Sequence, residues 1–125
     1  VYRKECSLPQ SLMQQLAQAK NIPKKYKDWS SIPISIAVLE VKGVLVALIN
    51  MPTIFCYLAT NLNFNTKFAF NAEFLLDSAR MQLCQSNIAN AWNGFILQCM
   101  IKEHINFLSL LSLTPIYLYF SSLQV

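Results

Sequence analysis

The chain has 125 residues, which is enough for one domain with its own core and too few for two. Hydrophobic residues make up 54% of it and charged residues 13%, whereas ordinary soluble domains carry about 25% charged residues. So low a charge predicts an outer surface that faces lipid or is covered by partner subunits, and the presence of only two glycines argues against a barrel or sandwich.

Residues 1–33 form a basic, polar N-terminal region, and residues 1–42 hold the whole net charge of +4. A helix is predicted over residues 7–20, because Ser7 suits an N-cap, Pro9 suits the first turn and leucines recur along one side. By the positive-inside rule, the basic excess predicts that the N-terminus lies on the cytoplasmic, matrix or stromal side of a membrane, possibly in an organelle.

The stretch over residues 21–33 is the most linker-like part of the chain, since it contains two prolines and a pair of serines. Pro23 is expected to begin a short helical turn there. That turn places two aromatic side chains beside lysines, an arrangement typical of residues that lie at lipid headgroups. The basic cluster is short for a nucleic-acid surface, so no nucleic-acid partner is expected. The predicted membrane-interface residues are Lys24, Lys25, Tyr26, Lys27 and Trp29.

Residues 43–62 form the first candidate membrane span, because no charged side chain lies between Lys42 and Lys67. A helix of that length covers the hydrocarbon thickness of a bilayer at about 1.5 Å per residue. Asn50 is expected to bond to a neighbouring helix and Pro52 to kink the span, as polar residues and prolines do in membranes.

The same stretch supports a second interpretation, a soluble α+β domain with an antiparallel meander over residues 34–70. β-Branched residues are frequent in it, Lys42 and Gly43 suit a turn between two strands, and residues 61–71 alternate between apolar and polar. The low charge of the chain favours the membrane interpretation over this alternative.

Residues 72–101 are predicted to form the clearest helix, since apolar residues recur at three- and four-residue steps. One of them, Trp92, is expected to pack inside the chain. The opposite face carries uncharged amides, and an unpaired amide away from water costs about 1 to 3 kcal/mol. This face is therefore expected to meet another protein subunit, with Gln85, Asn87, Asn90 and Asn93 as its predicted partner-binding residues.

The second candidate span covers residues 105–123, within a final run that carries no charge. Lys102, Glu103 and His104 precede it and are expected to mark its boundary. His104 is the sole histidine, and a boundary role is expected for it rather than metal binding or acid-base chemistry.

No catalytic, metal-binding or cofactor-binding motif occurs in the sequence, and no cofactor is expected. The cysteines are expected to be free thiols, because they form no C-x-x-C pair and most lie in apolar surroundings. An enzyme that uses Cys84 or Cys99 with His104 has no local signature to support it.

We therefore interpret residues 1–125 as a single domain of mainly α class. It is expected to be a small helical membrane protein with two transmembrane helices, an N-terminal amphipathic helix and a long connecting helix. The expected function is that of a non-catalytic structural or accessory subunit of a membrane complex, with other protein subunits and the lipid bilayer as partners. The alternative is a soluble α+β protein-interaction domain.

Overall fold

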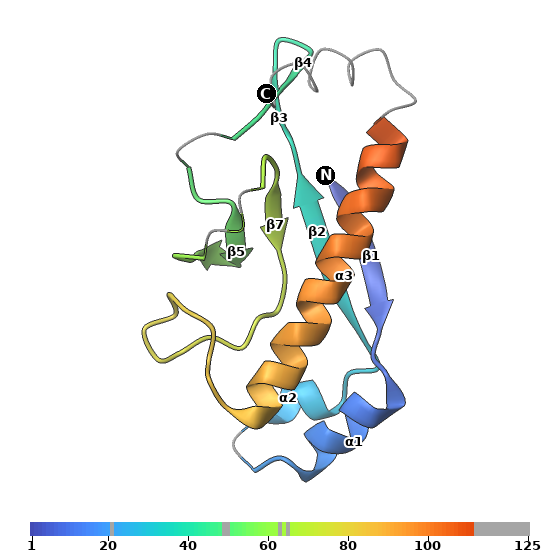
Figure 1. Ribbon diagram of the computed structural model, residues 1–125, viewed down its shortest axis with the longest axis vertical. Helices are drawn as coiled ribbons and strands as arrows, with labels where there is room; N and C mark the ends of the chain where they lie inside the picture. The colour runs from blue at the N-terminus through green and yellow to red at the C-terminus, as the bar shows by residue number, and fades with distance from the viewer. Residues whose placement is uncertain (21, 49–50, 63, 65, 112–125) are drawn as a thin grey trace.

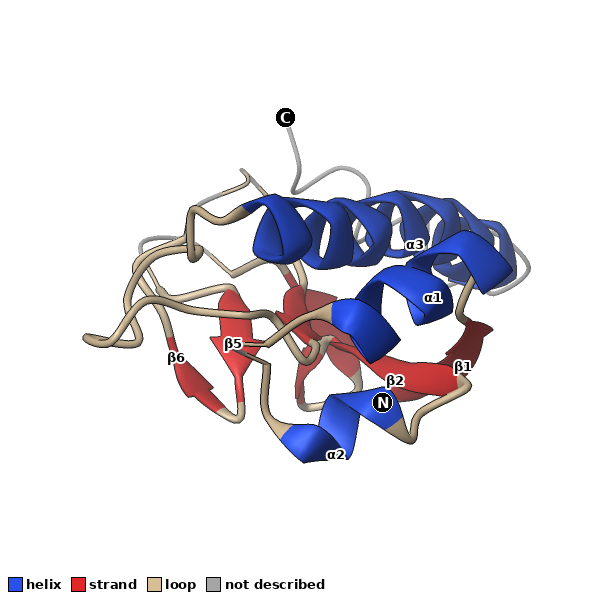
Figure 2. Cartoon of the chain, turned by 90° about the horizontal axis from the view of Figure 1, so that it is seen from below, coloured by secondary structure: helices blue, strands red, loops and turns tan. Residues whose placement is uncertain are grey.

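The chain has an α+β fold in which one long helix lies across one face of a mixed sheet (Figure 1 and Figure 2). The computed structural model describes residues 1–20, 22–48, 51–62, 64 and 66–111. The α+β alternative is confirmed as the fold class, and the prediction of a mainly α protein is wrong. In chain order the described elements are β1 (Tyr2–Ser7), α1 (Gln10–Gln18), α2 (Lys24–Lys27), β2 (Ser31–Ala37), β3 (Leu39–Val41), β4 (Val44–Val46), β5 (Ile54–Cys56), β6 (Leu58–Ala59), β7 (Ala69–Asn71) and α3 (Asn87–Leu111).

The main sheet has five strands in the order β1-β2-β7-β5-β6, and β3 and β4 form a separate hairpin. β5 and β7 pair in parallel, whereas the other neighbours in the main sheet are antiparallel. The meander predicted over residues 34–70 is therefore formed only in part. Its residues do supply strands, but these belong to two sheets, and one of the sheets is mixed.

The interior strand β2 shows how one face of the sheet is covered. Burial alternates along it, with Ile32, Ile34 and Ile36 fully buried and the residues between them half-buried. Successive side chains of a strand point to opposite faces, so the three isoleucines share the face that packs against α3 (Figure 2). Trp92 and Ile96 of α3 are fully buried in the same core. The expectation that Trp92 packs inside the chain is confirmed.

Two short helices, α1 and α2, lie near one end of the sheet (Figure 1). The predicted helix over residues 7–20 is confirmed in its central part, where Leu12 and Leu16 are buried. It begins at Gln10, because Ser7 is still paired with β2 as the last residue of β1. The short helical turn predicted after Pro23 is α2.

The first candidate span, residues 43–62, contains no helix among its described residues, and Asn50 lies outside them. β4 pairs with β3 across a turn at Lys42 and Gly43, as the alternative interpretation predicts. Both turn residues have positive φ, 52° and 78°, as a tight hairpin turn requires. After Pro52, β5 and β6 continue the extended backbone. The β-branched and aromatic side chains of this segment thus favour strands over a helix. The segment lacks charged residues because its strands are short and partly covered.

The second candidate span, residues 105–123, is not a separate element in the described part of the chain. Residues 105–111 are the last part of α3, and residues 112–123 lie outside the described residues. None of the described helices has the length and apolar character that a membrane crossing needs. The prediction of a membrane-spanning protein is wrong. The predicted membrane location and the predicted side of the N-terminus were derived from it and are not supported either.

The helix predicted over residues 72–101 is displaced toward the C-terminus, since α3 begins at Asn87 and runs to Leu111. Its start follows from Ser86, whose Oγ accepts the N–H of Ala89 at 3.2 Å and caps the first turn. Upstream, Asp77 closes a loop instead, because its backbone N–H donates to the carbonyl of Gln82 at 2.9 Å. The charged step at residues 102–104 thus lies inside a helix and not at its boundary.

Candidate functional site

Glu73 is a buried carboxylate that lines a cavity of about 300 Å³ between α2, α3 and β5. It follows β7 by two residues, in a segment where Ala72 and Phe74 are also buried. A carboxylate is almost never buried unless it is paired, so its partners decide what this site can do.

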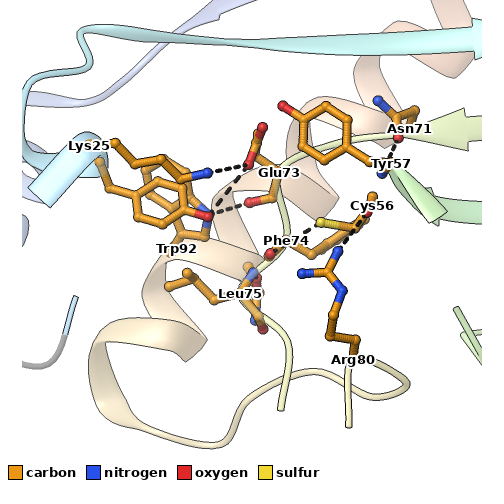
Figure 3. Close-up of polar contacts among 11 residues, drawn as sticks. Lys25, Cys56, Tyr57, Asn71, Glu73, Phe74, Leu75, Arg80 and Trp92 are labelled. Carbon is orange, nitrogen blue, oxygen red and sulfur yellow. Dashed lines mark hydrogen bonds and ion pairs between the residues drawn. The ribbon is translucent and has the colours of Figure 1, made fainter. Parts of the chain in front are cut away.

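Two residues of α2 approach the Glu73 carboxylate from the same side (Figure 3). The hydroxyl of Tyr26 donates to Oε2 at 3.4 Å, and Nζ of Lys25 lies 3.9 Å from the same oxygen. From α3, Nε1 of Trp92 donates to the backbone carbonyl of Glu73 at 2.7 Å. The rings of Tyr26 and Trp92 meet edge to face, with centroids 5.2 Å apart. Glu73 therefore ties α2 and α3 to the segment that follows β7.

The opposite wall of the cavity is formed by Cys56 and Arg80 (Figure 3). Nη2 of Arg80 donates to the backbone carbonyl of Cys56 at 3.0 Å. The Cys56 thiol donates to the carbonyl of Phe74 at 3.5 Å. The backbone of Arg80 has a φ of 61°, a left-handed conformation that costs a non-glycine residue energy.

The electrostatics of the cavity keep the hydroxyl of Tyr26 and the thiol of Cys56 protonated at neutral pH. Burial, with the charge of Glu73 next in importance, raises the pKa of Tyr26 to about 12. Burial is also the main cause that raises the pKa of the Cys56 thiol, and Glu73 again adds to it. A cysteine that serves as the nucleophile of an enzyme is activated by a lowered pKa, so these residues can order the fold or bind a polar group but are not activated for catalysis.

The predicted partner-binding residues do not share one surface. Asn93 is buried, and its amide bonds to both backbone groups of Leu75. Gln85 is exposed but precedes α3, and its Nε2 donates to the carbonyl of Leu83 at 3.3 Å. Asn87 and Asn90 are exposed on the first turns of α3. Asn87 also lines an open groove of about 400 Å³ between α1 and α3, together with Gln15 and Gln18.

The predicted membrane-interface residues lie in α2 and directly after it. Tyr26 is buried and belongs to the core, and Trp29 is half-buried with its ring centroid 5.0 Å from that of Tyr26. The lysines are exposed, and Nζ of Lys27 donates to the carbonyl of Ala19 at 2.6 Å. Both aromatic rings therefore serve packing within the chain.

The side of α3 that faces away from the sheet carries an apolar stripe. We define the outer stripe as Gly94, Leu97, Ile101, Ile105 and Leu108, which lie within about 80° of one another at about 100° per residue. Leu97 and Leu108 form its edge, since they are half-buried and also pack against the core. Ile101 is 64% exposed and Ile105 is 60% exposed. A Cβ atom added at Gly94 would meet no atom within 4 Å, so the stripe has an open notch there.

Sequence reasoning missed both Glu73 and the outer stripe. The signal for Glu73 was a lone acid between apolar residues, A-E-F, directly after an alternating strand. The signal for the outer stripe was the continuation of apolar residues through and beyond Lys102, which the sequence interpretation assigned to a membrane span.

Comparisons with protein-family models, curated protein sequences and solved structures returned no match to this chain. Among the described residues, no group of three or more histidine, cysteine, aspartate or glutamate side chains is placed to hold a metal ion. The fold, the Glu73 cavity and the outer stripe are therefore the features that bear on the function of the chain.

Proposed function

We propose that this chain is a non-catalytic protein-interaction domain that associates through the outer stripe of α3. The observation that carries the proposal is the exposure of Ile101 and Ile105, 64% and 60%, on the face of a helix where polar side chains are the rule. Burying one such side chain is worth about 1.5 to 3 kcal/mol, so a partner that covers the stripe gains substantially.

The occupant that the stripe fits is the same stripe of a second copy of the chain. Gly94 leaves a notch, and Ile105 projects eleven positions later, about 16 Å along the helix axis. In an antiparallel pair of α3 helices related by a two-fold axis, each Ile105 lies opposite the Gly94 of the other copy. Such reciprocal contact is what an isologous interface requires.

Charge does not oppose this pairing. The outer stripe contains no charged residue, and the exposed Lys102 of α3 lies beside the stripe and not in it. Asn87 and Asn90 continue the same side of α3 toward its N-terminal end. They are the predicted partner-binding residues that are exposed on α3, and their amides supply hydrogen bonds at the edge of the interface.

The chemistry of the Glu73 cavity supports a non-catalytic function. The Cys56 thiol and the Tyr26 hydroxyl are held protonated, and neither has a lowered pKa. The polar contacts of Glu73 also hold α2 and α3 together, which gives α3 a fixed position for binding.

Sedimentation equilibrium of the purified chain tests the proposal. The wild type is expected to show a concentration-dependent dimer, and Ile105→Lys is expected to be a monomer because the lysine cannot be buried in the notch. Leu58→Lys is the matched control, since Leu58 is 68% exposed on β6, away from α3, and the variant should dimerise as the wild type does. A wild type that stays monomeric, or equal dimerisation of both variants, contradicts the proposal.

A further inference from the structure

Two cysteines at opposite ends of the sequence, Cys6 in β1 and Cys99 in α3, lie side by side. Both residues line one cavity of about 420 Å³, and each thiol affects the pKa of the other. The crossing of the two elements explains this proximity. Tyr2, at the start of β1, donates to Oε1 of Glu103 at 3.1 Å, and Glu103 is one turn after Cys99. Strand alternation places Cys6 on the same face of β1 as Tyr2.

We propose that Cys6 and Cys99 form a redox-sensitive dithiol that a low-molecular-weight disulfide oxidises to an intramolecular disulfide. Both residues are half-exposed and line the open cavity, so a small reagent reaches them without unfolding of the chain. This site is separate from the outer stripe and does not depend on the proposed association.

The environment of the two thiols determines which of them attacks the small disulfide first. The neighbouring Cys99 thiol and the charge of Lys102 both favour the Cys6 thiolate and act to lower its pKa. Burial still raises the pKa of Cys6 above its ordinary value, and burial and Cys6 together raise that of Cys99 to about 12. Cys6 is therefore the attacking thiol, and the reaction is slow at neutral pH and faster in alkaline solution.

The exchange proceeds in two balanced steps. The Cys6 thiolate attacks one sulfur of the small disulfide, breaks its S–S bond and displaces one thiolate, which leaves a mixed disulfide on Cys6. Cys99 then gives its proton to the solvent and attacks the Cys6 sulfur, which releases the second small thiol. The small disulfide is reduced to two thiols, and the two cysteines are oxidised to one disulfide.

The other two cysteines provide an internal comparison. Cys56 and Cys84 also line a common cavity, the one beside Glu73. Cys56 is buried, however, and its thiol donates to the carbonyl of Phe74 rather than to a cysteine. The geometry thus selects the Cys6 and Cys99 pair for oxidation.

Treatment of the full chain with oxidised glutathione, followed by intact mass and non-reducing peptide mapping, tests the proposal. The expected wild-type product has lost two hydrogens and joins the Cys6 and Cys99 peptides. Cys99→Ser is expected to stop at one glutathione on Cys6, whereas Cys84→Ser is expected to behave as the wild type does. The oxidised wild type should also unfold at a higher urea concentration, and reductant should reverse this shift, because the disulfide closes a loop from residue 6 to residue 99.

Phenylarsine oxide gives a second measurement that needs no variant. The trivalent arsenic bridges two adjacent thiols, so the native chain is expected to bind one equivalent and release it to a dithiol but not to a monothiol. A chain that stays reduced, one that keeps a stable glutathione adduct on Cys6, or a crosslink between Cys56 and Cys84 would overturn the proposal. So would a chain from which a monothiol removes the arsenical.

Discussion

The side-chain amide of Asn93 pairs with the backbone of Leu75 as a neighbouring strand would. Its Oδ1 accepts the N–H of Leu75 at 2.8 Å, and its Nδ2 donates to the carbonyl of the same residue at 2.9 Å. Asn93 is 3% exposed, so water replaces these bonds poorly. One amide on α3 thus holds the irregular segment that leads from β7 to the helix.

We expect Asn93→Ala to lower the free energy of unfolding by about 1 to 3 kcal/mol, because it leaves the N–H of Leu75 without a partner and removes one of the two donors to the Leu75 carbonyl, which keeps the N–H of Cys84. Urea unfolding followed by circular dichroism measures the change. Gln14→Ala is the control, an exposed amide on α1, and should change the stability by less than about 0.5 kcal/mol. Equal effects of the two substitutions would show that the Asn93 amide is not a structural contact.

Tyr26→Phe removes the hydroxyl that donates to the buried carboxylate of Glu73. The loss of a hydrogen bond to a charged group is expected to lower the free energy of unfolding by about 1.5 to 3 kcal/mol. Tyr57 is 67% exposed, so Tyr57→Phe is the control and should leave the stability nearly unchanged. Urea unfolding again measures both variants, and a neutral Tyr26→Phe would mean that Glu73 is stabilised by other contacts.

The Asn93 and Glu73 contacts illustrate which features the sequence could predict. The helix near residues 7–20, the turn at Lys42 and Gly43 and the burial of Trp92 all follow from local patterns, because each depends on neighbours in the chain. The partners of Asn93 and Glu73 come from segments far away in sequence, and no periodicity reveals them. The sequence pattern of an amide on a helix is the same whether the amide faces a partner protein or a backbone segment of its own chain.

The error in fold class has a physical cause as well. A run without charge is equally compatible with lipid and with short strands that share a core, so the length of residues 43–62 could not decide between them. The β-branched residues were the better guide there. Likewise, serine is a preferred N-cap residue and Ser86 could have marked the start of the helix, but the apolar spacing upstream of it suggested an earlier start.

His104 makes the stability depend on pH in a defined direction. Its ring lies edge to face against Phe68 and Phe70, with centroids 5.2 and 5.4 Å away, and burial lowers its pKa below the ordinary 6.5. On acidification, the unfolded chain therefore takes up a proton at a higher pH than the folded chain does. Well above pH 6.5, protonation of His104 does not affect the free energy of unfolding. The free energy of unfolding falls as the pH drops from 6.5 toward the lowered pKa of His104 in the folded chain.

Urea unfolding at several pH values between about 7.5 and 5 measures this loss. His104 is the only histidine, so His104→Gln should remove most of the slope in this range. A slope that is unchanged in the variant would assign it to another group.

The turn between β3 and β4 can be improved by one substitution. Lys42 has a φ of 52°, which asparagine adopts more readily than lysine, and Asn-Gly is the preferred pair for such a hairpin. Lys42→Asn is expected to raise the free energy of unfolding by about 0.5 to 1 kcal/mol. Gly43→Ala should lower it by about 1 kcal/mol through backbone strain. A Cβ at that position would meet no atom within 4 Å, so crowding does not contribute. A destabilising Lys42→Asn in urea unfolding would contradict this account of the turn.

The central claim is that the outer stripe of α3 packs against its counterpart in a second copy. Isotope-filtered nuclear Overhauser spectroscopy on a mixture of labelled and unlabelled chain tests it most directly, because only contacts between copies give a signal. Only two glycines occur in the chain, so the α-protons of Gly94 can be assigned without ambiguity. The account predicts a cross-peak between the Ile105 methyl groups of one copy and the Gly94 α-protons of the other. The absence of any intermolecular signal from the outer stripe, at concentrations where the wild type is expected to be dimeric, would contradict it.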